Sequence, residues 1–274
     1  MRNIKARDII FIALIILAVV VLALPTLLGS LGPLPPTNIR SIAINYLNAT
    51  YNQLNPGLWT SSPEAVAAIV WDYRGLDTLF ETAVFYSAII AALVLYRDIL
   101  GEKDVLKGRG LSIVVQRATA ISMVGILVVG AATILHGQLT PGGGFQGGAI
   151  AAVAPVIAIV VFSRFLIDRS RLSYKHLLLV RNIALACIAL IPLIPIISLA
   201  IGYSQVFIFQ NQVKAVSNFT FPQIIIDVPM GGTIWFFNLF EGLAVVSAFS
   251  LAVIVIFYSE EMSRKAIEGE DIGF

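Results

Sequence analysis

The sequence predicts an all-α integral membrane protein with six transmembrane helices. Of its 274 residues, 58% are hydrophobic and only 12% are charged, and the mean hydropathy is +0.90. Several apolar runs reach about 20 residues, which is the length that an α-helix needs to cross a bilayer. The expected spans are residues 8–29, 78–96, 111–135, 147–165, 176–201 and 233–258.

The first span is expected to stay in the mature protein. Its apolar core from Ile9 to Leu24 is long, and no small-residue cleavage site clearly follows before Pro25. After prolines 33, 35 and 36, residues 38–54 carry Ile39, Ile42 and Tyr46 on one helical face, which indicates an interfacial helix.

The distribution of basic residues sets the orientation of the spans. The N-terminus, the loops after the second and fourth spans, and the C-terminus carry all of the 18 Lys and Arg residues except Arg40, Arg74 and Lys214. Arg181, near the start of the fifth span, is counted with the loop before it. Since cytoplasmic loops accumulate Lys and Arg, both termini are predicted to be cytoplasmic.

The loop 98–110 divides the chain into two predicted parts. Residues 1–100 form a two-helix membrane segment, and residues 111–274 form a four-helix domain. The outer segments 31–62 and 202–232 lie on the side opposite the basic loops, and the aromatic residues of the second are expected to pack on protein or at the membrane interface.

A glycine-rich segment between the third and fourth spans is the first candidate site. Lipid cannot satisfy bare peptide groups, so such a segment must be buried in protein or line a wet cavity. Its candidate residues are His136, Thr140, Pro141, Gly142, Gly143, Gly144, Phe145, Gly147 and Gly148. His136 either offers a titratable group to an ion or bonds the last helix carbonyls. The glycines either expose carbonyls or allow close helix packing.

A second candidate site lies where the second span begins. Asp72, Arg74, Asp77 and Glu81 all precede or enter this span. In a continuous helix Arg74, Asp77 and Glu81 share one face, so an ion pair or a proton relay can form. A carboxylate about one turn inside a span costs roughly 2 to 3 kcal/mol, which favours a functional role for Glu81. The alternative is that Thr78 and Glu81 form a capping box.

Glu241 lies about two turns into the sixth span and is not expected to face lipid. Such a carboxylate suits a proton or cation path, but a structural hydrogen bond between helices explains it equally well. Cys187 is the single cysteine, so no cysteine-ligated metal or cluster can be built from this chain alone. No bound cofactor, stably bound metal or nucleic-acid partner is expected; Na+ or H+ would be the transported ion.

The two motifs resemble neighbouring parts of one family. Residues 139–148, Leu-Thr-Pro-Gly-Gly-Gly-Phe-Gln-Gly-Gly, resemble the signature of the B subunit of Mrp-type multisubunit Na+/H+ antiporters, a likeness that extends over about residues 110–260. Residues 71–81 are similar to a pattern in the carboxy-terminal part of the A subunit, a likeness that covers about residues 64–100. Phe80 departs from the family pattern, which usually has glycine there. The same module occurs in membrane-bound hydrogenases and related ferredoxin-linked complexes.

The resemblance implies a non-catalytic subunit of an ion-translocating assembly in the cell membrane, with other membrane subunits and the lipid bilayer as partners. It also implies that Glu81, Thr140, Pro141 and Phe145 serve cation transport. Two alternatives remain open at this point. The chain is either a purely structural subunit of such an assembly or a self-contained carrier of a small solute, although six short spans without an inverted repeat argue against the carrier.

Overall fold

The computed structural model describes residues 6–29, 38–55, 59–95, 110–162, 174–210 and 219–268. The chain divides into two units, Met1–Ile44 and Asn45–Phe274. The first unit contains α1 (Ala6–Leu27), a helix of apolar residues with Pro25 in its last turn. Helix α2 (Ser41–Thr50) begins in the first unit and ends in the second. A helix is therefore present where the interfacial helix was expected, but it is shorter than residues 38–54, and its place at a membrane interface stays a prediction.

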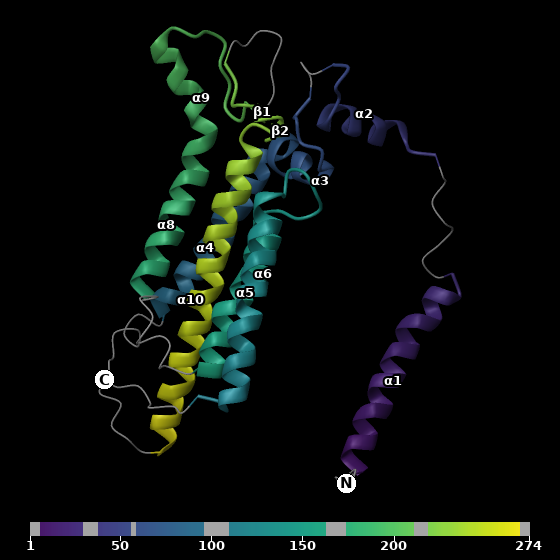
Figure 1. Cartoon of the computed structure of the whole chain (residues 1–274), viewed down its shortest axis with the longest axis vertical. Helices are drawn as coiled ribbons and strands as arrows, with labels where there is room; N and C mark the ends of the chain where they lie inside the picture. The colour runs from purple at the N-terminus through teal and green to yellow at the C-terminus, as the bar shows by residue number, and fades with distance from the viewer. Residues whose placement is uncertain are drawn as a thin grey trace. The chain divides into compact units, whose positions relative to one another are not determined.

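The second unit is a helical bundle with a small hairpin. Figure 1 shows α4, α5, α6, α8 and α10 running alongside one another, and α10 packs against both α6 and α8. In chain order the elements are α3 (Ala65–Ala68), the π-helix η2 (Ile69–Tyr73), α4 (Gly75–Leu95), α5 (Ile113–Leu135), α6 (Gly144–Phe162), α8 (Tyr174–Leu190), η3 (Ile191–Leu193), α9 (Ile194–Ile197), η4 (Ser198–Ile201), β1 (Ile224–Ile225), β2 (Val228–Pro229) and α10 (Ile234–Glu268).

Five helical segments of the described chain are long and apolar enough to cross a membrane, so the protein is a multi-pass membrane protein. They are Gly75–Leu95, Ile113–Leu135, Gly144–Phe162, Lys175–Ile201 and Ile234–Ile256. The prediction of a further span in α1 stays a prediction, as do the cytoplasmic termini and the division near residue 100. The basic loops 96–109 and 163–173, on which the orientation rests, and prolines 33, 35 and 36 lie outside the described residues.

Glycines bring α5, α6 and α10 into close contact. A Cβ atom at Gly130 of α5 would lie 2.9 Å from the backbone nitrogen of Ala151 in α6. A Cβ atom at Gly148 of α6 would lie 2.8 Å from the backbone oxygen of Gly242 in α10. Gly148 is one of the small residues that the sequence assigned to helix packing, and it lies at such a crossing; Gly130 lies at another that the sequence analysis did not single out.

Three polar segments meet at one end of the bundle. The Ser62 hydroxyl donates to the Gln138 carbonyl at 2.9 Å, and the Gly231 amide donates to the Ser61 carbonyl at 3.0 Å. The chain before α3, the glycine-rich segment and the chain before α10 therefore meet at one end of the bundle, and the sequence analysis had also put the glycine-rich segment and the start of the second span on a common side. The β1–β2 hairpin at this end was not predicted, and its turn residues Ile226 and Asp227 both have positive φ, as in a type I′ turn.

Aromatic side chains join this end to the bundle. The rings of Trp71 in η2 and Phe237 in α10 stack with centroids 4.5 Å apart. Phe209 packs against Phe237, and its ring closes on Gly75, where a Cβ atom would lie 2.9 Å from it. Phe221 also packs against this cluster. Phe209 and Phe221 of the segment 202–232 therefore pack on protein, which is one of the two expected places, and Phe209 holds the entry of α4 against α10.

Gly130→Ala should destabilise the folded protein by about 1 to 3 kcal/mol, because its methyl group would collide with the backbone of α6. Gly125→Ala is the matched control, since it lies on the same helix and a Cβ atom there meets nothing within 4 Å. Thermal melting of both variants in detergent measures the difference. Equal melting temperatures for the two variants would contradict the close α5–α6 packing.

Candidate functional site: a cavity between α4, α6 and α10

A cavity of about 360 Å³ brings the two intramembrane carboxylates together. Glu81 comes from α4 and Glu241 from α10, while Phe145 comes from the first turn of α6. The cavity is lined by Val70, Thr78, Glu81, Thr82, Phe85, Tyr86, Phe145, Gln146 and Glu241. Glu81 and the glycine-rich segment, which are far apart in the sequence, therefore meet in space.

Helix α4 places Glu81 in its second turn. The helix begins at Gly75, so Thr78 already lies inside the first turn and is not its N-cap. The Thr78 hydroxyl instead donates to the Val70 carbonyl at 2.7 Å. The capping-box interpretation of Glu81 is therefore wrong. Phe80, which differs from the family pattern, is 65% exposed and is not among the cavity residues, so it does not close the cavity.

Glu241 caps α6 from the neighbouring helix. Its Oε2 atom accepts the Phe145 amide at 3.0 Å, and one turn earlier the Asn238 Oδ1 atom accepts the Gly144 amide at 3.2 Å. The first amides of a helix have no partner within it and carry partial positive charge, so they attract a carboxylate. The proposed structural hydrogen bond of Glu241 thus exists, and the same carboxyl group also lines the cavity.

The caps from α10 also explain why α6 begins earlier than predicted. The predicted span began at residue 147, whereas the helix begins at Gly144. A Cβ atom at Gly144 would lie 2.5 Å from the Asn238 carbonyl oxygen and 2.7 Å from the Glu241 Cβ atom. Glycine is therefore required for α10 to reach these amides. Nothing in the local sequence identifies the two capping residues, which lie more than 90 positions further on.

Tyr86 and Gln146 belong to the cavity but were missed in the sequence. Tyr86 is only 2% exposed, and its hydroxyl has no hydrogen-bond partner among the described residues. It packs with Ala184 of α8 and Ala244 of α10 and interacts electrostatically with Glu241. A tyrosine in an apolar run does not stand out in the sequence. Gln146, in contrast, lies inside the recognised glycine-rich motif, so its position in the motif could have identified it as a candidate.

The position of Arg181 corrects the predicted distribution of basic residues among the loops. It was counted with the loop after the fourth span, but it lies within α8 and is only 4% exposed. Its Nε and Nη2 atoms donate to the Asn182 Oδ1 atom at 3.2 and 2.9 Å, and it interacts electrostatically with Tyr86. A buried arginine in a span is a candidate functional residue by default.

Asp72, Arg74 and Asp77 line a separate, more open hollow of about 440 Å³ with Phe209 and Ile208. Arg74 pairs with Asp77, while the Asp72 carboxylate accepts the Thr60 hydroxyl at 3.0 Å. Burial raises the pKa of neighbouring Tyr73, so its hydroxyl stays neutral. The expected ion pair is present, but the structure does not bring it into the Glu81 cavity.

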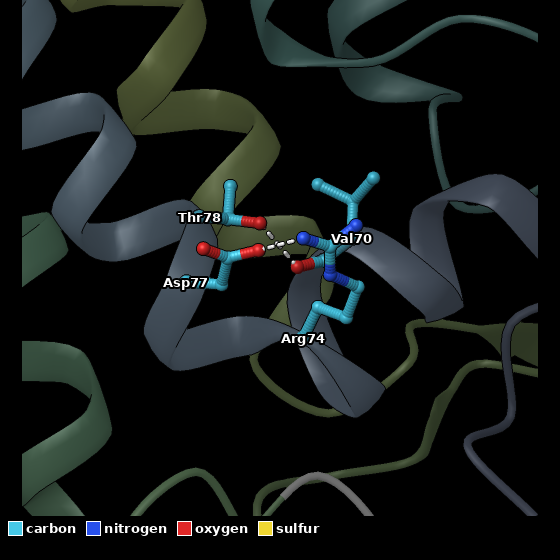
Figure 2. A network of polar contacts seen from close by, with 4 residues as sticks. All are labelled: Val70, Arg74, Asp77 and Thr78. Carbon is cyan, nitrogen blue, oxygen red and sulfur yellow. Dashed lines mark hydrogen bonds and ion pairs between the residues drawn. The ribbon is translucent and has the colours of Figure 1, made fainter.

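Neighbouring residues at the junction between η2 and α4 line the two hollows. Figure 2 shows the Arg74–Asp77 pair beside the bond from Thr78 to the Val70 carbonyl. Val70 and Thr78 line the cavity that contains Glu81. Arg74 and Asp77 line the second, more open hollow, which is called the outer hollow below. The π-helix shifts the carbonyls out of the regular ladder, and such turns are frequent at functional sites.

The remaining residues of the glycine-rich segment build its backbone. The His136 carbonyl accepts the amides of Leu139 and Thr140 at 2.8 and 2.9 Å, and the residue ends α5. Gly143 has φ of +140°, and Gly142 packs against Thr133. Pro141 is exposed beside them. Of the predicted loop residues only Phe145 lines the cavity, while Gly144, Gly147 and Gly148 pack helices together.

Comparison with known proteins identifies the family. Domains related to the MnhB subunit of Na+/H+ antiporter match residues 114–251, which is half of the chain. The chain belongs to this family. An uncharacterised protein of Methanocaldococcus jannaschii is 27% identical over 225 residues, which cover 76% of this chain and 82% of that protein.

Two solved structures share the fold of this MnhB-related chain. One is a chain of the membrane-bound sulfane sulfur reductase, an archaeal respiratory membrane complex, with a TM-score of 0.56 and 22% identity over 90% of this chain and 98% of that one. The other is a chain of the Mrp complex from Dietzia sp. DQ12-45-1b, with a TM-score of 0.52 and 17% identity over 93% of this chain and 26% of that one.

The MnhB-related region supplies only part of the cavity. Phe145, Gln146 and Glu241 lie within the matched residues 114–251, whereas Glu81 and Tyr86 precede them on α4. The cavity therefore forms where the MnhB-related domain packs against the preceding helix.

Thr78→Val should lower the free energy of unfolding by about 1 to 2 kcal/mol, because it leaves the Val70 carbonyl without its hydroxyl donor. Thr82→Val is the matched control, since the Thr82 hydroxyl bonds the Thr78 carbonyl four residues earlier, an acceptor that also takes part in the helix. Thermal melting in detergent tests this, and equal losses in the two variants would rule out a special role for the Thr78 bond.

Proposed function

We propose that the chain is a non-catalytic subunit of an Mrp-like membrane assembly and that its cavity forms part of a path for Na+ or H+. The observation that carries this proposal is the meeting of Glu81 and Glu241 in one cavity within the membrane bundle. Two carboxylates are expensive in a membrane interior, and such groups usually mark ion or proton routes. Membership in a family related to an antiporter subunit supports the same conclusion.

The exposure of Glu81 supports a subunit rather than a self-contained carrier. Its side chain is exposed on α4, and the neighbouring Phe80 and Val84 are 65% and 70% exposed. A carboxylate facing lipid costs roughly 2 to 3 kcal/mol or more at the centre of a span. Another membrane subunit would cover this face and complete the wall of the cavity. The two structural neighbours are chains of multisubunit complexes, which is consistent with such partners.

The outer hollow would serve as the entrance. Asp72 and Asp77 place negative charge beside it, and Arg74 limits that charge through its pair with Asp77. Focused negative potential raises the local concentration of cations. In this arrangement six spans, with α1 as the first, and cytoplasmic termini put the entrance and the glycine-rich segment on the outer side of the cell membrane.

Glu81→Gln should reduce ion transport by the assembly to background while the subunits still co-purify, because the amide can neither take up a proton nor hold a cation by charge. The assay is ion uptake into liposomes that contain the purified assembly. Glu64→Gln is the matched control, since Glu64 caps α3 and an amide oxygen can keep that bond.

A purely structural subunit would give a different pattern. In that case Glu81→Gln would either prevent co-purification or leave transport unchanged. Wild-type transport by an assembled Glu81→Gln variant would remove Glu81 from the path.

A further inference from the structure

We propose that Asn238 is the positioning residue for Glu241, because it holds the Gly144 amide and so leaves the Glu241 carboxyl group able to face the cavity. Asn238 itself is not among the described residues that line the cavity. The inference rests on the proposed function, since it explains how one of the two carboxyl groups on the proposed path is kept available.

Two acceptors on α10 share two amides at the start of α6. Asn238 and Glu241 are three positions apart, so they lie on the same face of α10. The Asn238 Oδ1 atom accepts the Gly144 amide at 3.2 Å, and the Glu241 Oε2 atom accepts the Phe145 amide at 3.0 Å. Each acceptor therefore holds one amide, and the carboxyl group is not needed at Gly144.

The Glu241 carboxyl group is placed to take over the second amide if Asn238 loses its oxygen. Its Oε2 atom lies 2.6 Å from the point where a Cβ atom of Gly144 would stand. The first amides of a helix carry partial positive charge and attract a carboxylate. A free Gly144 amide would therefore draw the Glu241 carboxylate onto the helix end and away from the cavity.

The bond to Gly144 also fixes which way the Asn238 amide points. The Gly144 N–H donates, so the side-chain oxygen must face it and the side-chain nitrogen must face away. This nitrogen lies 2.7 Å from the point where a Cβ atom of Gly137 would stand, at the other end of the glycine-rich segment. Glycine at position 137 leaves the room that the amide nitrogen occupies.

The choice of asparagine is not explained by its own hydrogen bonds. Asn238 is only 1% exposed, and its Nδ2 atom has no partner among the described residues. An enclosed donor without a partner destabilises a fold. Aspartate would accept the same amide without this donor, but it would place a second negative charge beside Glu241. Asparagine therefore caps α6 without adding a second carboxyl group beside Glu241.

Carbodiimide labelling of the purified assembly tests the position of the Glu241 carboxyl group. N,N′-dicyclohexylcarbodiimide reacts with protonated carboxyl groups in apolar surroundings, and mass spectrometry identifies the modified residue. A carboxylate that accepts two helix amides stays ionised and does not react. Asn238→Leu has a similar volume but no acceptor, so it should reduce labelling at Glu241 about threefold or more. Labelling at Glu81 in the same sample should stay unchanged.

Asn238→Asp is the matched control, since it has the same shape and keeps an oxygen for the Gly144 amide. Its labelling at Glu241 should be at least as strong as in the intact protein, because a neighbouring negative charge favours protonation. If Asn238→Leu does not assemble, Asn238→Ala takes its place.

Unchanged labelling at Glu241 in Asn238→Leu or Asn238→Ala, or an equal loss in Asn238→Asp, overturns the positioning role. Failure of both Asn238→Leu and Asn238→Ala to assemble would make Asn238 a purely structural residue and overturns it as well. Wild-type transport by Glu81→Gln would overturn the proposed function and leave the labelling result as it stands.

Discussion

The close approach of α6 to α10 is the constraint on which the candidate site depends. Gly144 and Gly148 lack side chains where the two helices cross, and a Cβ atom at either position would collide with the α10 backbone. This contact lets Asn238 and Glu241 cap the first amides of α6. The glycines therefore bear on the proposed ion path indirectly, because they fix where the Glu241 carboxyl group lies.

The same contact explains why the cavity is built from distant parts of the chain. The capped end of α6 places Phe145 and Gln146 beside Glu241, and the stacking of Trp71 on Phe237 fixes the entry of α4 against α10. Glu81 then faces the cavity two turns into its helix. The Glu241 carboxyl group caps the start of α6 and also lines the cavity, so its structural role and its proposed role in ion transport fall on one side chain.

Much of this was accessible from the sequence. Hydropathy predicted six spans, and five of them are helices of the described chain that are long and apolar enough to cross a membrane. The cost of buried charge selected Glu81 and Glu241 as candidate residues, and the structure places both in one cavity. The extra turn at the start of α6 could not be predicted from the local sequence, because its capping residues come from α10. The predicted capping box at Thr78 was also wrong, because the Thr78 hydroxyl donates to the carbonyl of Val70 in the preceding π-helix.

Tyr86 and Arg181 mark the limit of sequence reasoning. A tyrosine in an apolar span has no distinctive pattern, and its meaning depends on the neighbours that packing gives it. Arg181 was grouped with a basic loop because it lies near a predicted boundary, and only the fold places it in the bundle. When the surroundings of a side chain are formed by several helices, its role cannot be inferred from the sequence of its own helix alone.

A cryo-electron microscopy map of the whole assembly in lipid, at saturating Na+, tests the central claim most directly. We expect density for an ion or ordered water beside the Glu81 and Glu241 carboxyl groups, with a neighbouring subunit covering the open side at Glu81. A cavity filled by apolar side chains of a neighbour, with no polar contact to either carboxylate, would contradict it.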